Sequence, residues 1–548
     1  MNKHVKSYKK EGKIEGSYDV IVIGSGMSGM STAAFLAKEG KKVLVLERHY
    51  EPGGFTHTFK RNKYEWDVGV HYVGEVHKPY SMVSRVFRYI NDVEIKWEEI
   101  GEVYDKMVFG DQIYEFKKGK EEFKTSLKKQ FPDPVDQASI DEYLVQMDLA
   151  QKSNNYYVAE KTIPEKKSKR IKRKLRRKAL SFNRPTLEVM NEITSNKKLI
   201  AVLIGQYGDY GTQPSESSFL MHSILANHFL NGGSYPIGGS SEIFNAVAPT
   251  INKNGGAIYI KAEVSEILIN EQNESLGVKM SDGTEVKAKQ VVSSAGVFNT
   301  FNRLIPNTIA ENLGLDAKLN SISRSTGHMC LYIGLQHTDK ELGIGKGNYW
   351  IFPDNYDHDV NIEAFRADSS SDFPVTYISF PSSKDPSWQE RFPGTSTIEV
   401  ITAAPYEWFD KWEDERWMKR GEEYEALKED MSQRLLEKLY EREPQLRGKI
   451  DFYELSTPLS TKHFCNYDQG ELYGVDHDVA RFDQDFLKPE TPVKNLFLTG
   501  QDIVSVGIAG ALASGMVTAS AVTGKTLMVK MYGSWWKFIK NMLGFKVD

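Results

Sequence analysis

The sequence lacks several features that would point to a small secreted or metal-binding protein. Among its 548 residues there are only two cysteines, Cys330 and Cys465, far apart and without C-x-x-C spacing. Neither a disulfide framework nor a zinc knuckle is indicated, and a reducing compartment suits the chain. No H-E-x-x-H motif or cluster of histidines and cysteines predicts a metal, and no internal repeat occurs.

Long apolar runs and a strong net charge are also missing. No window of about 18 apolar residues occurs, and the basic N-terminus MNKHVKSYKKEGKIEGS lacks the apolar core of a signal peptide. The net charge of −4 gives no global reason to expect nucleic acid as a partner. We therefore expect a cytoplasmic protein of two or more domains, because one hydrophobic core rarely organises so long a chain.

The sequence does contain a nucleotide-binding fingerprint near its start. YDVIVI (18–23) is an apolar run of strand length, GSGMSG follows it, and MSTAAFLAKEG has the composition of a helix. Gly24 permits a tight turn, Gly26 lets a pyrophosphate approach the backbone, and Gly29 lets helix and strand pack closely. KKVLVLE then predicts a second strand ending at Glu47, whose carboxylate suits a ribose and opposes a 2′-phosphate.

A second segment of this kind lies near the C-terminus. NLFLTGQD (495–502) predicts another strand, and IVSVGIAGALASGMVTASAV after it predicts a helix of small residues. The first turn of such a helix offers free N–H groups and a positive dipole end to a phosphate or a negatively charged ring. A dinucleotide cofactor long enough to reach both ends of the chain is implied, and both FAD and NAD satisfy this pattern.

Several further motifs make the chain resemble a known family. Besides GSGMSG and LFLTGQD they are ERHYEPGG, THTF, DVGVHYVG, NHFLNGGSYPIGGSSEI and YGVDHDVARF. Together they resemble the FAD-dependent oxidoreductases of the phytoene desaturase type, and within these most closely the retinol saturase family. The resemblance implies FAD as cofactor. The contacts that it implies are Gly24, Gly26, Gly29, Glu47, Arg48, Gly53, Gly54, Val264, Gly500, Asp502 and Ile508.

The fold class expected is α/β, with a discontinuous Rossmann-type FAD-binding domain and an interleaved α+β substrate domain. In the middle of the chain, alternating strands with a turn at Asp282-Gly283 predict a hairpin. The expected boundaries are 15–75, 231–300 and 485–527 for the FAD domain, 76–230 and 301–484 for the substrate domain, and 528–548 for an amphipathic tail.

The resemblance also implies the chemistry, which is saturation of a C=C bond in a retinoid, a carotenoid or a related long polyene. Flavin moves a hydride, and the protein must supply a proton. By analogy residues 66 to 72 line the active site, so His71 and Tyr72 are the leading proton donors and His57 comes next. Each of the three also suits a role in holding a loop or the cofactor. Second-rank candidates are Tyr235, Asp476 and His477.

Alternatives remain open for the reaction and the electron donor. A desaturase or isomerase of the same substrates would have a similar site, and a flavoprotein that binds lipid without catalysis or an amine oxidase also fits. No second dinucleotide fingerprint occurs, and GIGKG (343–347) predicts a loop. Reducing equivalents would therefore come from NAD(P)H bound transiently in the substrate cleft or from a separate donor.

Two cationic segments predict attachment to a membrane surface. KKSKRIKRKLRRK (166–178) has ten basic residues in thirteen, and WWKFIKNMLGFK (535–546) is amphipathic at helical spacing. The first also suits a solvated loop or a nucleic-acid patch, and the second suits a helix docked on its own core. We expect peripheral membrane binding and no nucleic acid; the oligomeric state is left open.

Overall fold

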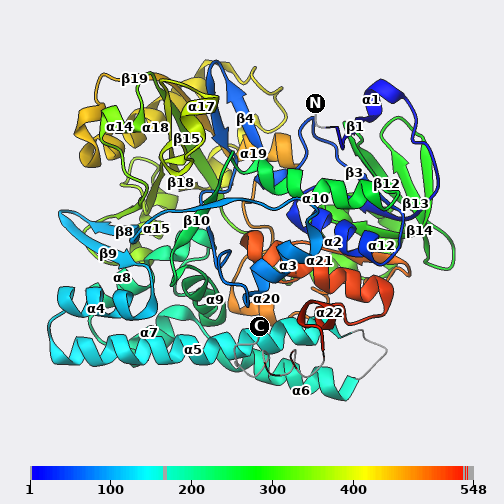
Figure 1. The fold of residues 1–548 in the computed structure, drawn as a ribbon, viewed down its shortest axis with the longest axis horizontal. Helices are drawn as coiled ribbons and strands as arrows, with labels where there is room; N and C mark the ends of the chain where they lie inside the picture. The colour runs from blue at the N-terminus through cyan, green and yellow to red at the C-terminus, as the bar shows by residue number, and fades with distance from the viewer. Residues whose placement is uncertain (1–2, 164–168, 535–536, 538–539, 541–548) are drawn as a thin grey trace.

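The computed structural model describes residues 3–163, 169–534, 537 and 540. Two large sheets lie side by side, and a layer of helices runs beneath them in the view of Figure 1. The sheet on the right carries the nucleotide fingerprint, and the sheet on the left combines strands from residues 103–117 with strands from residues 327–456. The α/β class predicted from the sequence is confirmed.

The first sheet has eight strands and brings together three distant parts of the chain. Its central strands are apolar and buried on both faces, as expected of a parallel sheet covered on both sides. β12 and β13 add an antiparallel extension. In spatial order its strands are β1 (Lys6–Ser7), β11 (Ala257–Ile260), β3 (Val43–Leu46), β2 (Tyr18–Ile23), β14 (Glu285–Ser293), β13 (Ser275–Met280) and β12 (Val264–Ile269), with β20 (Leu496–Leu498) also paired to β14.

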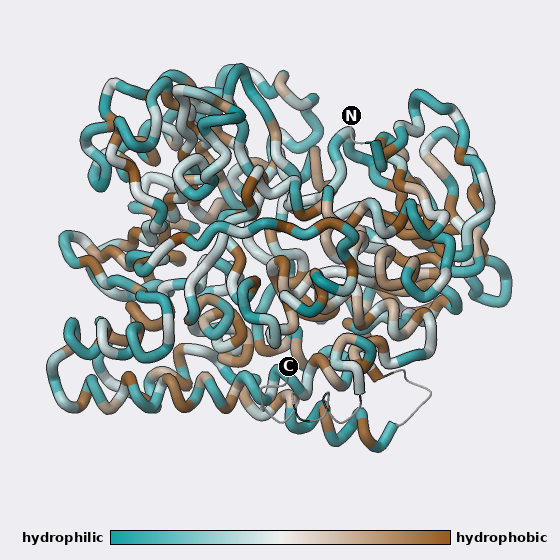
Figure 2. The backbone as a smooth tube through the Cα atoms, in the orientation of Figure 1, coloured by the Kyte–Doolittle hydropathy of each residue, from teal (hydrophilic) through white to brown (hydrophobic). Residues whose placement is uncertain are grey.

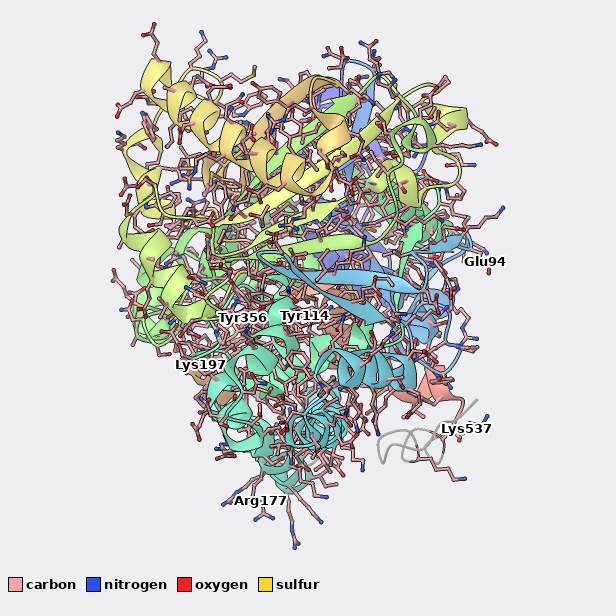
Figure 3. All side chains as sticks on the ribbon, turned by 90° about the vertical axis from the view of Figure 1, so that its left-hand side faces the viewer. Glu94, Tyr114, Arg177, Lys197, Tyr356 and Lys537 are labelled. Atoms are coloured by element: carbon pink, nitrogen blue, oxygen red, sulfur yellow. The ribbon has the colours of Figure 1, made fainter. Side chains whose placement is uncertain are left out.

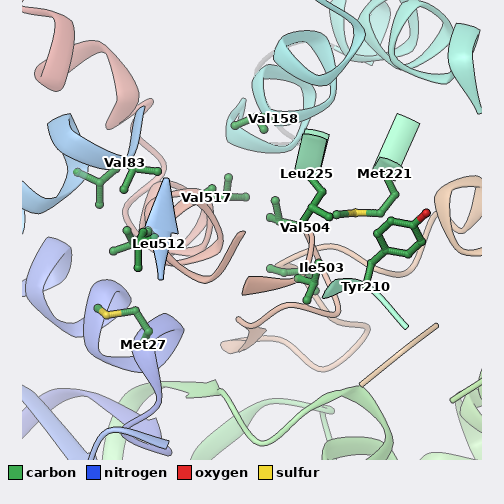
Figure 4. Packing of buried hydrophobic residues seen from close by; sticks show 14 of the residues in the cluster. Met27, Val83, Val158, Tyr210, Met221, Leu225, Ile503, Val504, Leu512 and Val517 are labelled. Carbon is green, nitrogen blue, oxygen red and sulfur yellow. The ribbon is translucent and has the colours of Figure 1, made fainter. Parts of the chain in front are cut away.

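Two helices of small residues pack tightly against one another beside this sheet. They are α2 (Met27–Lys38) and α21 (Gly507–Thr523). A Cβ on Gly515 would lie 2.4 Å from the Cβ of Ser31. The two helix backbones can therefore approach this closely only because residue 515 is a glycine. Figure 4 shows Met27 of α2 and Leu512 of α21 within this buried layer. α10 (Ser241–Lys253) and α3 (Met82–Ile90) also pack on α2.

The second sheet has seven strands and is largely antiparallel. All nine residues of β15 are buried, and α18 (Gly421–Arg442) packs on β17 and β19. In spatial order its strands are β19 (Ile450–Ser456), β15 (Gly327–Leu335), β18 (Ser396–Ala404), β17 (Thr376–Ser379), β16 (Asn348–Phe352), β8 (Val103–Phe109) and β9 (Gln112–Lys117).

The segment after the fingerprint connects the two sheets. β4 (Thr58–Arg61) and β5 (Tyr64–Asp67) form a hairpin, and the indole of Trp66 donates a 3.0 Å hydrogen bond to the carbonyl of Ile333 in β15. The chain then enters a three-stranded sheet of β6 (Val73–Gly74), β10 (Gly233–Pro236) and β7 (Trp97–Glu99). Residues 68 to 72 therefore run between the two large sheets.

The lower layer is helical. Its longest member, α5, packs on α6, α9 and α21, and in Figure 2 hydrophilic and hydrophobic residues alternate along α5 and α6. Within the described residues, no helix is both long and apolar enough to cross a membrane. The helices are α4 (Lys120–Gln130), α5 (Pro134–Thr162), α6 (Lys169–Ala179), α7 (Thr186–Ile193), α8 (Lys197–Leu203) and α9 (Phe219–Phe229).

Most local predictions are confirmed. The two strand–helix units are present, the N–H of Gly283 closes the predicted hairpin turn on the carbonyl of Met280 at 2.9 Å, and GIGKG is a loop between α14 (Asp339–Leu342) and β16. The basic tract is the helix α6 from Lys169 onward. The domain boundaries stay a prediction. β1 lies before the expected start, and β10 pairs with β7 across an expected boundary. After α22 (Met528–Tyr532), the proposed amphipathic helix 535–546 falls almost entirely outside the described residues.

Candidate active site

A cavity of about 700 Å³ extends between the two large sheets. Its walls come from the fingerprint loop, from residues 68 to 73, from α9, from the seven-stranded sheet and from the start of α21. Parts of the chain that are hundreds of residues apart therefore meet at one site. It has a glycine-lined part and an apolar part.

Glycines shape the first part of the cavity. A Cβ on Gly29 would lie 2.3 Å from the carbonyl oxygen of Gly24, and a Cβ on Gly54 would lie 2.9 Å from the Cα of Gly26. Helix, strand and loop are thus packed as closely as the backbone allows. Gly26 differs, because a Cβ there would meet no atom within 4 Å and it lines the cavity. This open path beside a helix N-terminus fits a pyrophosphate.

Glu47 follows β3 and lies at the edge of this cradle. Its Oε2 accepts hydrogen bonds from the backbone N–H and the hydroxyl of Ser25, at 2.9 and 2.8 Å, and its Oε1 accepts one from His49 N–H at 2.7 Å. The Ser25 hydroxyl oxygen in turn accepts the N–H of Gly53 at 3.0 Å. The carboxylate is held in place by the turn itself, with one side facing the cavity where a ribose would lie.

The opposite wall of the cradle comes from the C-terminal segment. The carboxylate of Asp502 accepts N–H bonds from Val297 at 2.7 Å and Val475 at 2.9 Å. It therefore joins three loops, and a Cβ on Gly474 would collide with it. α21 begins nearby, and its second residue Ile508 lines the cavity. The donors and the space present fit the two ends of an FAD molecule.

Most of the cofactor contacts implied by the resemblance face this cavity. Gly29 and Gly53 are absent from its lining. They pack instead against Gly24 and Thr56. Whether each residue contacts the cofactor stays a prediction. The lining residues among them are Gly24, Gly26, Glu47, Arg48, Gly54, Val264, Gly500, Asp502 and Ile508.

His71 lines the cavity and contacts a buried carboxyl group. Its Nδ1 lies 2.8 Å from Oε2 of Glu399, whose side chain is fully buried, whereas the imidazole is 17% exposed. Burial, with the Lys384 ammonium nearby, lowers the pKa of His71 to about 3, and burial raises the pKa of Glu399 to about 8. Near neutral pH the contact therefore joins a neutral imidazole and a neutral carboxylic acid, not an ion pair.

Tyr72 also lines the cavity, but its hydroxyl points into a polar cluster. The hydroxyl donates to Asp105 at 3.0 Å, and the ring stacks on Phe229 at 4.2 Å. Asp105 also accepts from Gln206 and Asn348, at 2.8 and 2.9 Å. Burial and the charge of Asp105 raise the pKa of Tyr72 well above its ordinary value. These contacts suit a tyrosine that shapes the cavity better than one that gives up a proton.

His57 is the third predicted donor and lies nearer the glycine cradle. Its Nδ1 is 2.6 Å from the carbonyl oxygen of Gly54, and its ring lies against His49 with centroids 5.0 Å apart. Burial lowers its pKa to about 4, so the ring is neutral at physiological pH. The bond to Gly54 fixes the ring against the turn, which suits a role in holding the cofactor loop.

Some sequence predictions about the lining are wrong. The lining of this stretch begins at Val68, while Trp66 is buried among Tyr64, Cys330 and Tyr332. It packs there because β5 lies against the seven-stranded sheet.

The three second-rank candidates are also absent from the lining. The Tyr235 hydroxyl is bound to the carboxylate of Asp67, and the Thr212 hydroxyl to that of Asp476. His477 is fully buried. Tyr235 and His477 are buried away from the cavity, and Asp476, which is half-buried, is held by Thr212. The motifs alone gave no sign of this.

Two charged residues beside the site were missed. Glu399 lies within β18, and Lys384 ends the short helix α16 (Pro381–Lys384). The ammonium of Lys384 donates to the carbonyl of His71 at 3.1 Å and to the Asn348 side chain at 2.6 Å. A lone glutamate in the apolar strand STIEVITAA was the one signal available, because a strand buried on both faces rarely contains a charged residue.

The far part of the cavity is mainly apolar and aromatic. α9 contributes Met221, Ile224 and Leu225, and the seven-stranded sheet contributes Trp350 and Tyr377. Figure 4 shows Met221 and Leu225 side by side on α9. A long apolar molecule could be enclosed here. No group of three or more His, Cys, Asp or Glu side chains placed to hold a metal ion occurs in the part of the chain that the structure describes.

Comparison with known proteins identifies the family. Residues 27–523 match the family described as flavin containing amine oxidoreductase. The all-trans-retinol 13,14-reductase of Danio rerio is 35% identical over 552 residues, which is 97% of this chain and 90% of that protein. The chain belongs to the all-trans-retinol 13,14-reductase family of flavin oxidoreductases. The predicted resemblance is confirmed, and a flavin is the family's cofactor.

Other matches define what this membership implies. A second Danio rerio member of the family, named inactive all-trans-retinol 13,14-reductase, is 33% identical over 95% of this chain and 88% of its own length. A solved oxidoreductase from Methanosarcina mazei has a TM-score of 0.60 at 16% identity, covering 91% of this chain and 99% of its own. That likeness shows the fold.

Proposed function

We propose that this protein is an FAD-dependent reductase that saturates a C=C bond in a retinoid or a related long apolar polyene. The observation that carries the proposal is that one cavity has both a glycine cradle suited to FAD and an apolar part formed by α9 and the seven-stranded sheet. The kinship with all-trans-retinol 13,14-reductases supports the retinoid as the substrate class.

The chain's own residues have defined tasks in this reaction. FAD, when bound and reduced, would supply a hydride equivalent to one carbon of the double bond. The apolar wall excludes water and orients the chain of the polyene. His71 donates a proton to the other carbon, because it contacts both the cavity and a buried acid. Two C–H bonds form and the π bond is lost.

The electron donor is proposed to be NAD(P)H, bound transiently through the same cavity. A donor of this type would supply two electrons and one proton, which would balance the hydride used on the polyene. The cavity extends from the glycine cradle to apolar and aromatic walls, so a nicotinamide could approach before the polyene enters. A separate electron-transfer protein is the alternative.

We also propose that the protein takes its substrate from a membrane surface, on which it lies without crossing. The outer side of α6 supplies a cluster of cations, namely Lys169, Arg170, Arg173, Lys174 and Arg177, all exposed. Figure 3 shows Arg177 at the lower end of the molecule, pointing away from its body. Each Lys or Arg near an anionic bilayer contributes about 1 kcal/mol.

The proposed function is tested by flavin oxidation. Protein reduced without oxygen by NADPH, by NADH or by dithionite is mixed with all-trans-retinol, with a carotenoid and with a polar amine. We expect the yellow oxidised spectrum to return with the retinoid, and mass spectrometry to show a product two hydrogens heavier. Reoxidation by the amine alone would overturn the proposal and favour an amine oxidase. A polyene product of unchanged mass would favour an isomerase.

A further inference from the structure

Glu399 has a carboxyl group at a fully buried position, where an ionised carboxylate costs free energy. It lies within β18, opposite Tyr332 of β15 and Ser379 of β17, and its side chain is fully buried. Its Oε1 accepts one hydrogen bond, from the N–H of Asp67 at 3.1 Å. Its Oε2 lies 2.8 Å from Nδ1 of His71, in contact but without the alignment of a hydrogen bond, and neither atom has another hydrogen-bond partner among the residues that the structure describes. An ionised carboxylate with a single donor would be poorly compensated here, so the group is neutral instead.

The charged and titratable groups around Glu399 come from several elements. Asp67 of β5 is itself buried, and burial raises its pKa to about 6. Lys384 lies on the side of α16, and burial lowers its pKa to about 8. Cys330 and Tyr332 of β15 also face Glu399, and burial raises the pKa of each well above its ordinary value. Lys384 thus supplies the positive charge in this group, and it is bound to the carbonyl of His71.

His71 lies between this buried acid and the cavity. Its Nδ1 is on the side of Glu399, and the rest of the ring lines the cavity and contacts Tyr377 edge-on, with centroids 5.3 Å apart. A neutral imidazole can give a proton from Nε2 only if Nδ1 receives one, since the alternative leaves an imidazolate. An acid 2.8 Å from Nδ1 makes that exchange feasible once the ring turns to bring the two atoms into line.

We propose that Glu399 is the proton source of the reduction and that His71 relays its proton to the substrate carbon. The inference deepens the proposed function and rests on it. The Glu399 O–H bond breaks and Nδ1–H forms, while Nε2–H breaks and the new C–H bond forms on the polyene. His71 ends as the other neutral tautomer and Glu399 as a carboxylate beside the Lys384 ammonium. After product leaves, one solvent proton binds at Nε2 and the Nδ1 proton returns to Glu399, which restores both groups. Glu399 is a positioning residue because it acts through His71.

The test compares Glu399→Gln, Glu399→Asp and a matched control, Asp339→Asn. Asp339 is another largely buried acid, with a pKa raised to about 6 by burial, and it lies outside the cavity lining, bound to the Ser382 hydroxyl at 2.7 Å. A glutamine side chain in place of Glu399 would keep the shape and the bond to Asp67 but would have no acid proton. We expect kcat to fall about 100-fold in Glu399→Gln with KM for retinol and FAD content unchanged. The fall in kcat should be smaller in Glu399→Asp, and the kcat of Asp339→Asn should equal that of the wild type.

The pH profile and the infrared spectrum provide readouts that a structural role would not change. Because the acid form of Glu399 is required, the wild-type kcat should fall as pH rises through about 8. This decrease at alkaline pH, the alkaline limb of the profile, should be absent in Glu399→Gln. The infrared band of a protonated carboxylic acid, measured on protein without substrate, should weaken over the same pH range. It should be smaller in Glu399→Gln than in the wild type at neutral pH.

The outcomes separate the relay from the proposed function. Wild-type protein that leaves every retinoid unreduced contradicts the proposed function, and the relay with it. Wild-type protein that reduces retinol, with Glu399→Gln equal to it in rate and pH profile, overturns the relay alone. Equal infrared bands in the two proteins at neutral pH would show that Glu399 is ionised, which also overturns it. If Glu399→Gln does not fold, the test falls to Glu399→Asp. In that variant the pH at which kcat decreases should differ from that of the wild type, and an unchanged pH overturns the relay.

Discussion

Gly29 leaves no room for a side chain, because a Cβ there would lie 2.3 Å from the carbonyl oxygen of Gly24. Gly26, three residues earlier, has nothing within 4 Å of the same position. Two glycines of one motif thus have different reasons to be glycine. The first allows α2 to pack on β2, and the second keeps the floor of the cavity open.

Substitutions at these two glycines should therefore fail in different ways. We expect Gly26→Val to fold with the melting temperature of FAD-free wild-type protein but to lose its yellow colour, because the side chain enters the space proposed for the pyrophosphate. Gly29→Ala should lose stability, by about 1–3 kcal/mol, through overpacking. Thermal unfolding followed by circular dichroism and flavin absorbance of the purified proteins measure both effects. A Gly26→Val protein with full FAD content would refute the cradle.

His71 and Tyr72 are neighbours in sequence but should differ in their effect on catalysis. His71→Ala removes the group that contacts both cavity and buried acid, so kcat should fall about 100-fold with flavin absorbance nearly intact. Tyr72→Phe removes one hydrogen bond to Asp105, which keeps its bonds from Gln206 and Asn348.

We expect Tyr72→Phe to cost about 1 kcal/mol of stability and to slow turnover much less than His71→Ala. Single-turnover reoxidation of the reduced flavin by retinol separates chemistry from release of product. A wild-type reoxidation rate in His71→Ala, or a rate that falls further in Tyr72→Phe than in His71→Ala, would contradict the assignment of His71 as the proton donor.

A bulky substitution in the apolar part of the cavity should weaken binding of the polyene without loss of FAD. Ile224 lines the cavity from α9 and is only partly buried. Ile224→Trp should fill this space and raise KM for retinol by about tenfold, while FAD content stays that of the wild type. Ile224→Val is the matched control and should change KM little. Unchanged KM in Ile224→Trp would place the polyene elsewhere.

The nucleotide fingerprint was predictable because its information is local. Strand, glycine turn, helix and acidic residue follow one another within 18–47, and each residue type has a steric or electrostatic reason at its place. The hairpin turn at Asp282-Gly283 is local in the same sense.

The proton-relay partner was not predictable, because its information is non-local. Glu399 follows His71 by more than three hundred residues, and only the pairing of β15, β17 and β18 sets the carboxyl group against the imidazole. The sequence around it predicts a strand and no more. Trp66 was wrongly expected in the cavity for the same reason, since the hairpin that buries it depends on a distant sheet.

Binding to membranes should depend on the basic face of α6. Replacing Arg170, Arg173 and Arg177 by glutamine removes three cations that are exposed on that helix. Loss of ~3 kcal/mol of electrostatic attraction would weaken binding to anionic vesicles roughly 100-fold before salt screening. Leu175 and Ala179, which pack α6 onto the body, are untouched, so the fold should persist.

Vesicle co-sedimentation tests this prediction against a variant with the same change in net charge. Lys253, Lys289 and Lys494, with side chains 74%, 80% and 68% exposed, belong to the nucleotide-binding part of the fold, and their replacement by glutamine should leave binding unchanged. Added salt should release wild-type protein, and truncation after Gly533 should weaken binding independently of salt. Equal recovery of both triple variants on anionic vesicles would mean that net charge, not α6, governs attachment. Wild-type protein that stays in the supernatant at low salt would exclude the membrane role.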